Sequence, residues 1–298
     1  MPQSENFRPV SGLSEIAAPY RGLYCDIWGV MHNGVTAYPK AVDALRRFRA
    51  LHGPVVLITN APRPSGEVLA ALERFKIPAG TWDAVVSSGD VTRDLLTRHG
   101  GKKVYHLGPR RDFPVLRGIN VDLVGLADAD LILCTGLFND EGETPEDYRA
   151  MLEQARARSL EMICANPDRV VEVGDRLHYC AGALAEVYEA MGGPVTYAGK
   201  PHPPIYALAH EKLEAAAGQG VDNREILAIG DSIHTDLAGA AAMGLDALFV
   251  TGGIHDEEGR GQGQDPEPEH HAHTRRALME QCAEAGVAPR AMLRRLSW

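Results

Sequence analysis

The sequence predicts an α/β protein built on a doubly wound, Rossmann-like parallel sheet, with a second α/β domain inserted into it. Two observations predict this fold class. Short apolar runs typical of buried strands alternate with segments whose apolar residues recur at helical spacing, as in a parallel sheet covered by helices on both faces. The strand-and-helix pattern also stops and restarts within the chain. We therefore expect a core domain formed by residues 1–83 and 195–298 and an inserted cap at 84–194.

The composition is that of a globular protein with room for two domains. The chain has 298 residues, 45% of them hydrophobic and 23% charged, and its formal net charge is −10. Nucleic acids and anionic membranes require clustered cations, so we expect neither as a partner. The first residues lack the apolar core of a signal peptide, and no apolar run approaches the roughly 20 residues of a membrane span. A cytoplasmic location is expected.

The core domain is expected to begin with a buried strand at 22–25. This short run ends on Asp26 and passes at once into a turn marked by Gly29, the pattern of a strand that delivers a carboxylate to a sheet edge. Helix and strand then alternate. The expected elements are a helix at 39–52, a strand at 55–58 and a helix at 65–75.

The inserted cap is expected to repeat the same alternation from residue 84 onward. Its boundaries are marked by turn residues, most clearly Gly192-Gly193-Pro194 at its end. The expected strands lie at 84–86, 103–107, 131–134, 162–165 and 176–180. The expected helices lie at 90–99, from 145 onward, and at 182–191.

The last third is expected to return to the core domain. Its expected elements are a strand at 195–198, a helix at 203–217, a strand at 226–229, a helix at 235–243 and a strand at 247–250. The segment 259–273 is rich in Gly, Gln, Pro and acidic residues and is expected to be an exposed loop. Its histidines either bind a metal or face solvent: His270, His271 and His273.

Polar residues collect at four of the expected strand ends. In chain order these are Asp26, Thr59 with Asn60, Lys200, and Asp231 with Asp236. Each has a structural explanation as a turn residue, a cap or a solvated charge. Together they match the needs of phosphoryl transfer, which are a carboxylate nucleophile, donors for the phosphoryl oxygens, a cation, and further carboxylates to hold Mg²⁺. The set therefore indicates a phosphoryl-transfer site.

The order and spacing of these residues resemble the four motifs of the haloacid dehalogenase-like (HAD) hydrolase superfamily. The whole chain resembles its class IIA, the NagD-like and p-nitrophenylphosphatase-like group. Three further segments match that group: ANPD at 165–168, CAGAL at 180–184 and GKP at 199–201. The resemblance implies the HAD fold with a cap between the second and third motifs. It also implies an Mg²⁺-dependent phosphatase that acts on small phosphorylated molecules through an aspartyl-phosphate.

Carried over residue by residue, the resemblance implies that Asp26 is the nucleophile. Thr59 and Asn60 would bind the phosphoryl group, and Lys200 would neutralise its charge. The cation would be held by residues of the first and fourth motifs: Asp26, the backbone carbonyl of Trp28, Asp231 and Asp236.

The cap is expected to set substrate specificity. Asn166 and Asp168 are candidate substrate contacts or loop caps, and the sequence leaves both roles open. The expected partner is a small phosphorylated molecule, and a homodimer also stays open.

One position departs from the family pattern. The family's phosphatases have a second Asp two residues after the nucleophile, which protonates the leaving oxygen and then activates water, whereas this chain has Trp28. Losing assistance of about 10²- to 10⁴-fold would cost roughly 3–5 kcal/mol of barrier. His32 is the candidate substitute acid.

Two alternatives follow from this departure. One is a catalytically weak protein that binds a phosphorylated metabolite. The other is a dehalogenase-type hydrolase, because an aromatic residue also occurs at this position in the superfamily's dehalogenases. Carbon–halogen cleavage needs no Mg²⁺, so retention of both Asp231 and Asp236 argues against the second alternative.

Overall fold

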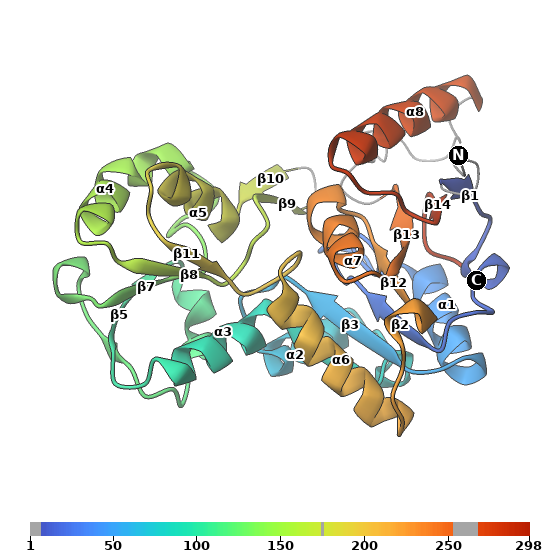
Figure 1. Cartoon of the computed structure of the whole chain (residues 1–298), viewed down its shortest axis with the longest axis horizontal. Helices are drawn as coiled ribbons and strands as arrows, with labels where there is room; N and C mark the ends of the chain where they lie inside the picture. The colour runs from blue at the N-terminus through green and yellow to red at the C-terminus, as the bar shows by residue number, and fades with distance from the viewer. Residues whose placement is uncertain (1–6, 174–175, 253–267) are drawn as a thin grey trace. The chain divides into compact units, whose positions relative to one another are not determined.

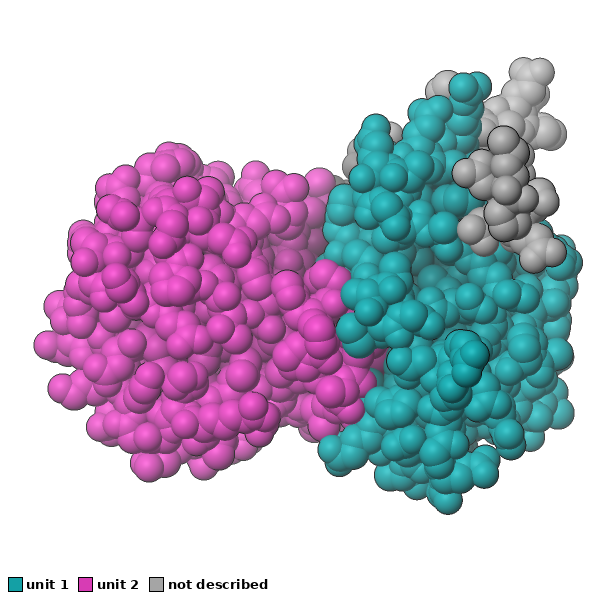
Figure 2. Space-filling view, in the orientation of Figure 1, with its two compact units in different colours: residues 1–57, 77–84, 209–298 teal, residues 58–76, 85–208 magenta. Residues whose placement is uncertain are grey.

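The computed structural model describes residues 7–173, 176–252 and 268–298 (Figure 1). It divides into two compact units, coloured separately in Figure 2. Unit 1 comprises Met1–Leu57, Ile77–Ala84 and Ala209–Trp298, and unit 2 comprises Ile58–Lys76 and Val85–Leu208. These limits differ from the expected core and cap at 58–76, at residue 84 and at 195–208. The expected domain boundaries stay a prediction.

A seven-stranded sheet has the order β1-β14-β13-β12-β2-β3-β4. Its strands are β1 (Arg8–Pro9), β2 (Gly22–Cys25), β3 (Val55–Thr59), β4 (Ala84–Ser87), β12 (Ile226–Gly230), β13 (Asp246–Val250) and β14 (Ala291–Leu293). The pairs from β1 through β14, β13, β12 and β2 to β3 are all parallel. From β2 the chain adds β3 and β4 on one side and later β12 and β13 on the other. The topological switch point therefore lies between β2 and β12.

Helices alternate with these strands as the sequence predicts. They are α1 (Pro39–Leu51), α2 (Ser65–Arg74), α6 (Pro203–Ala217), α7 (Ala238–Ala242) and α8 (Pro268–Glu284). Helix α1 begins at Pro39, which suits the first helical position. It buries Ala41, Leu45 and Phe48, which recur at the spacing of one helical face. None of the described helices is long and apolar enough to cross a membrane.

A second sheet of five strands lies within unit 2 in the order β11-β8-β7-β5-β6. Its strands are β5 (Lys103–Leu107), β6 (Asp122–Leu123), β7 (Leu131–Cys134), β8 (Glu161–Cys164) and β11 (Val195–Tyr197), and all pairs are parallel. Unit 2 also contains α3 (Ser88–Arg98), α4 (Arg149–Ala157) and α5 (Ala181–Ala190).

Helices cover both faces of this second sheet. Ile132 and Cys134 of β7 belong to a buried cluster that includes side chains of α4 and α5. Leu131 and Leu133, which point to the opposite face, belong to a cluster with Leu96 of α3. A strand buried on both faces must be apolar throughout, which explains the uninterrupted run at 131–134.

Three expectations need correction. The strand expected at 84–86 in the cap is β4, and it lies at the end of the seven-stranded sheet beside β3. The strand expected at 195–198 is β11, and it pairs with β8 in the second sheet instead of returning to the first. The strand expected at 176–180 is confirmed as β10 (Arg176–Tyr179). Its partner in a separate antiparallel hairpin is β9 (Val170–Val173), which the sequence did not reveal. Apolar pattern predicts that a strand exists, but its partner depends on contacts distant in sequence.

The expected loop at 259–273 is also wrong in part. Residues 253–267 lie outside the described part of the chain, whereas 268–273 form the start of α8. The expected histidine cluster therefore lies on a helix, whose first residue, Pro268, suits a helix start. Its composition of polar residues does not distinguish a loop from an exposed helix.

Candidate active site

Asp26 and Asp231 follow two neighbouring parallel strands. Cys25 of β2 is in register with Ile229 of β12, and the N–H of Asp26 donates to the carbonyl oxygen of Ile229 at 2.8 Å. The next residues along both strands therefore emerge side by side at the carboxyl edge of the sheet. This edge is at the switch point between β2 and β12, where open α/β sheets bind their ligands.

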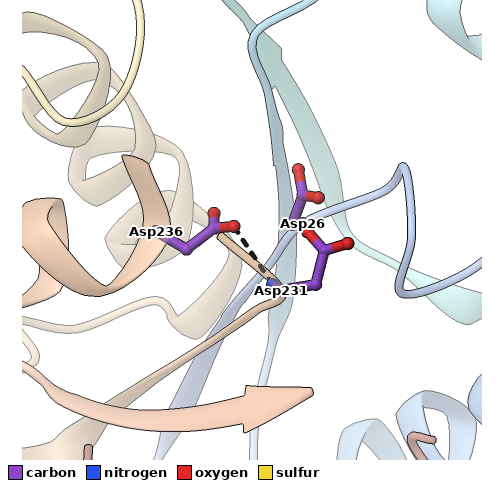
Figure 3. A group of neighbouring side chains, drawn as sticks. All are labelled: Asp26, Asp231 and Asp236. Atoms are coloured by element: carbon purple, nitrogen blue, oxygen red, sulfur yellow. Dashed lines mark hydrogen bonds between the residues drawn. The ribbon is translucent and has the colours of Figure 1, made fainter. Parts of the chain in front are cut away.

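Asp236 reaches the same place from the helical segment that follows β12. It lies in a five-residue π-helical turn, Ile233–Leu237. Its Oδ2 accepts hydrogen bonds from the N–H groups of Asp231 at 3.2 Å and Ser232 at 3.1 Å, the first of which is drawn in Figure 3. Asp236 therefore holds the main chain that carries Asp231.

The three carboxylates form one buried cluster (Figure 3). Asp26, Asp231 and Asp236 are 8%, 3% and 6% exposed, and one oxygen from each lies within 4.8 Å of the others. Three carboxylates so close together and away from water repel one another when ionised, and a cation between them lowers that repulsion. Hard oxygen ligands suit Mg²⁺ and Ca²⁺, so the residues present fit the cation that the resemblance implies.

Two glycines make room for this cluster. Gly29 adopts a φ of +80°, and a Cβ at this position would lie 1.9 Å from Oδ2 of Asp231. A Cβ at Gly230 would lie 2.1 Å from Cγ of Asp236. Only glycine is accommodated at either position without displacing a carboxylate.

Trp28 and His32 occupy the turn that follows Asp26. Their rings meet edge to face with centroids 5.1 Å apart. The N–H of Gly34 donates to Nδ1 of His32 at 3.0 Å, so a neutral imidazole carries its proton on Nε2. Burial lowers the pKa of His32 to about 4, because the charged form loses its hydration. The ring is therefore neutral at physiological pH.

Unit 2 brings together Asn60, Asp168 and Lys200. The side chain of Asn60 accepts the N–H of Lys200 at 2.7 Å and donates to its carbonyl oxygen at 3.1 Å. It also donates to Oδ1 of Asp168 at 2.9 Å. A Cβ at Gly199 would lie 2.3 Å from Oδ1 of Asn60, so glycine at this position permits the close approach. The GKP and ANPD segments thus meet the TN motif in one network.

The remaining predicted residues have local roles in unit 2. Thr59 is the last residue of β3, and its Oγ1 accepts the N–H of Ala61 at 3.2 Å. Oδ1 of Asn166 accepts the N–H of Asp168 at 3.1 Å. Of the two roles left open for Asn166, the structure therefore shows the loop cap.

Two polar side chains that the sequence did not single out are buried in unit 2 without a hydrogen bond among the described residues. They are the hydroxyl of Ser88 and Oδ1 of Asp112. Asp112 follows the strand β5 in the segment GPRRD, so a carboxylate after a strand was visible in the sequence. Its significance depends on the position of β5 in the sheet, which the sequence does not reveal.

Comparisons with known proteins agree with this architecture. Residues 23–122 match the family described as haloacid dehalogenase-like hydrolase, and residues 197–278 match a second HAD-hydrolase-like family. These two stretches contain all six of the polar residues found at the strand ends.

Individual relatives extend the similarity over almost the whole chain. One relative is a haloacid dehalogenase-like hydrolase from Brucella suis 1330, whose crystal structure is known and whose sequence is 42% identical to this chain. The two structures match with a TM-score of 0.84 over 96% of this chain and 99% of that chain. The ribonucleotide monophosphatase NagD of Escherichia coli is 27% identical over 241 residues, covering 78% of this chain and 88% of NagD. The p-nitrophenyl phosphatase from Archaeoglobus fulgidus shares the fold, with 22% identity, a TM-score of 0.69, and 93% and 96% coverage.

Proposed function

Because this chain belongs to the haloacid dehalogenase-like hydrolase family, we propose that it is an Mg²⁺-dependent phosphatase of small phosphorylated metabolites. The observation that carries the proposal is the buried carboxylate cluster of Asp26, Asp231 and Asp236. Relatives named as phosphatases, such as NagD, support the same reaction class. Small substrates are favoured because the family resemblance implies a cap over the site.

The proposed reaction proceeds through a covalent intermediate on Asp26. A carboxylate oxygen of Asp26 attacks the phosphorus, the bond from phosphorus to the leaving oxygen breaks, and the bonding electrons leave with that oxygen. Water then attacks the phosphorus of the aspartyl-phosphate and gives up a proton to the departed oxyanion or to solvent. The bond from phosphorus to the Asp26 oxygen breaks, which releases inorganic phosphate and regenerates the Asp26 carboxylate. Mg²⁺, held by the three carboxylates and the backbone carbonyl of Trp28, would supply positive charge against the phosphoryl oxygens.

Thr59, Asn60 and Lys200 are proposed to bind the same phosphoryl group. Their support is the match to the family's second and third motifs and the network that fixes Asn60 against both main-chain groups of Lys200. Lys200 is only 4% exposed. An ammonium group in so buried a position interacts strongly with nearby negative charge, which suits a residue that neutralises phosphoryl charge.

Proton transfer to the leaving group is the step for which the chain has no carboxylic acid at the family's position. His32 was the candidate substitute. Its pKa of about 4 leaves few protonated rings at neutral pH, and its Nδ1 is already engaged with Gly34. These contacts support an orienting role, in which His32 holds the Trp28 turn, and the leaving oxygen departs with little protonation.

The absence of that acid favours one second candidate, a protein that binds a phosphorylated metabolite and turns it over weakly. It shares the cation and phosphoryl ligands of the first. A dehalogenase-type reaction has less support because the carboxylate cluster would serve no purpose in it.

Turnover with and without a chelator separates these candidates. A purified protein should hydrolyse p-nitrophenyl phosphate with Mg²⁺, lose that activity in EDTA and regain it with excess Mg²⁺. Asp26→Asn should abolish turnover while the protein remains folded, and beryllium trifluoride should bind to Asp26 in the wild type. EDTA-resistant hydrolysis, or turnover by Asp26→Asn free of deamidation, would contradict the proposal. Phosphate binding without turnover would establish the second candidate.

A further inference from the structure

The second sheet has its own topological switch point. In its order β11-β8-β7-β5-β6, the chain runs from β5 to β6 on one side and then crosses to β7 on the other side of β5. Loops after the carboxyl ends of such neighbouring strands diverge and leave room for a ligand. Here the two loops begin at Gly108, after β5, and at Thr135, after β7.

These two loops are packed tightly at their starts. The N–H of Thr135 donates to the carbonyl oxygen of Leu107 at 2.8 Å. A Cβ at Gly108 would lie 2.0 Å from Oγ1 of Thr135, and the same hydroxyl lies 2.9 Å from Nε2 of His106. The base of the switch point is therefore rigid, and it fixes where the chain after Gly108 places its side chains.

Asp112 is the charged residue that this loop buries. It is 2% exposed, and its Oδ1 has no hydrogen bond among the described residues. Its nearest cation is Arg63, whose Nε lies 3.5 Å from that oxygen. The neighbouring Arg111 is already paired with Asp140. A buried carboxylate without a full set of partners is costly, and the ion pair with Arg63 offsets part of that cost while it fixes the guanidinium.

Arg63 has the properties of a ligand-binding arginine. Its side chain is 40% exposed, and within the described residues its one ionic partner is Asp112, with no hydrogen bond to the guanidinium. Nε faces Asp112, which leaves both Nη groups for a ligand. The main chain is fixed, because a Cβ at Gly89 would lie 2.3 Å from the carbonyl carbon of Arg63.

We propose that Arg63 is a specificity-determining residue, which binds a second anionic group, a carboxylate or a phosphate, on the part of the substrate beyond the transferred phosphoryl group. Asp112 is the positioning residue that holds Arg63. A planar guanidinium binds carboxylate or phosphate through two parallel hydrogen bonds. Arg63 follows Asn60, a proposed phosphoryl ligand, by three residues in the same unit. The inference rests on the proposed function and names its substrate class as phosphate monoesters with a second anionic group.

The test compares two ligands that differ in one group. 3-Phosphoglycerate has a carboxylate where glycerol 3-phosphate has a hydroxymethyl group. Binding of each is measured by calorimetry on full-length Asp26→Asn protein with Mg²⁺. This readout needs no turnover, so it judges Arg63 even if the phosphatase proposal fails. The protein should bind 3-phosphoglycerate more tightly.

Substitutions at Arg63 should act on one ligand only. Arg63→Gln should weaken the binding of 3-phosphoglycerate by roughly 10- to 100-fold. The affinity for glycerol 3-phosphate should stay within about 2-fold of the wild-type value. Arg63→Lys keeps the charge but not the planar guanidinium, so its affinity for 3-phosphoglycerate should lie between those of the wild type and Arg63→Gln. Arg98→Gln removes the same charge from an exposed position on α3 and should change neither affinity.

The role of Asp112 requires a double-mutant cycle. Asp112→Asn should weaken the binding of 3-phosphoglycerate and leave that of glycerol 3-phosphate unchanged. In the presence of Arg63→Gln it should have no further effect, because Asp112 acts through Arg63. Three results would overturn the inference. They are equal losses of affinity for both ligands, an unchanged preference for 3-phosphoglycerate in Arg63→Gln, and no binding of 3-phosphoglycerate to the protein.

Discussion

Gly29 and Asp231 stand in such close contact that a Cβ on Gly29 would lie 1.9 Å from Oδ2 of Asp231. The turn after the proposed nucleophile and the end of β12 are therefore built against each other. A side chain on the turn must displace the carboxylate, so the geometry of the cation site depends on a residue that contributes no ligand.

Gly29→Ala should therefore impair the cation site more than the fold. Alanine at a φ of +80° costs roughly 1–2 kcal/mol from backbone strain alone, and its methyl group must also push Asp231 away. We expect a large loss of Mg²⁺ affinity and of turnover, measured by Mg²⁺ titration of activity.

Gly244→Ala is the matched control. Gly244 also has a positive φ, +67°, but a Cβ there has nothing within 4 Å. Both variants should lose similar stability from backbone strain, and only Gly29→Ala should lose Mg²⁺ affinity. Equal Mg²⁺ affinity in the two variants would show that Asp231 accommodates the methyl group.

Asp231→Asn should remove most of the effect of a chelator on stability. Without a cation the buried carboxylates repel, so neutralising one should raise the melting temperature in EDTA, by roughly 2–4 °C for each kcal/mol relieved. With Mg²⁺ the wild type should gain stability and the variant should gain little. Differential scanning calorimetry in EDTA and in Mg²⁺ measures both.

Asp43→Asn serves as the control for net charge, because Asp43 is exposed on α1 and paired with Arg47. It should leave the Mg²⁺-dependent shift intact. An Mg²⁺ shift in Asp231→Asn as large as in the wild type would remove Asp231 from the cation site.

The rate of phosphoryl transfer should depend steeply on the leaving group. With Trp28 in place of the family's acid, the leaving oxygen departs with little protonation, so aryl and acyl phosphates should react far faster than alkyl phosphates. A series of substituted phenyl phosphates and a sugar phosphate, compared by kcat/KM, measures this dependence. Equal rates across the series, with binding shown not to limit them, would reveal another acid.

Trp28→Asp should flatten that dependence by restoring the acid. The indole packs edge to face with His32, and a Cβ at Gly34 would lie 2.6 Å from it, so the smaller carboxylate also creates a cavity that costs stability. Trp28→Phe keeps an aromatic ring without an acid and should keep the steep dependence. His32→Gln should not change the pH–rate profile if His32 only orients the turn.

His106 and Asp112 should give stability opposite dependences on pH. Burial lowers the pKa of His106 from 6.5 to about 4, so between those values the unfolded chain binds more protons and acidification destabilises. Burial raises the pKa of Asp112 from 3.8 to about 6, so over the overlapping window the folded chain binds more protons and acidification stabilises. Each effect amounts to roughly 3 kcal/mol when complete.

Removing either titratable side chain should reveal the contribution of the other to the pH dependence of stability. Relative to the wild type, His106→Gln should become more stable on going from pH 6.5 to 4.5, and Asp112→Asn should become less stable. Chemical denaturation at the two pH values gives the differences. Parallel pH dependence in both variants and the wild type would contradict these pKa shifts.

Much of this protein follows from local sequence. The apolar runs at 55–59, 131–134 and 226–230 are strands, because a strand covered on both faces has no polar side. Asp26 and Asp231 were identified as candidate site residues because each follows an apolar run of this kind. Spacing also marked the helix at 203–217, whose limits match α6.

The tertiary structure decided what depends on contacts between distant segments. It placed β11 beside β8, set β9 against β10, and made residues 268–273 the start of a helix. It also decided that Asp236 holds the main chain of Asp231, that Gly29 leaves room for that carboxylate, and that Arg63 lies against Asp112. Hydrophobic periodicity states which face of an element is buried, but not which element covers it. Strand ends could therefore be predicted from the sequence, whereas the partners of each polar group required the assembled sheets.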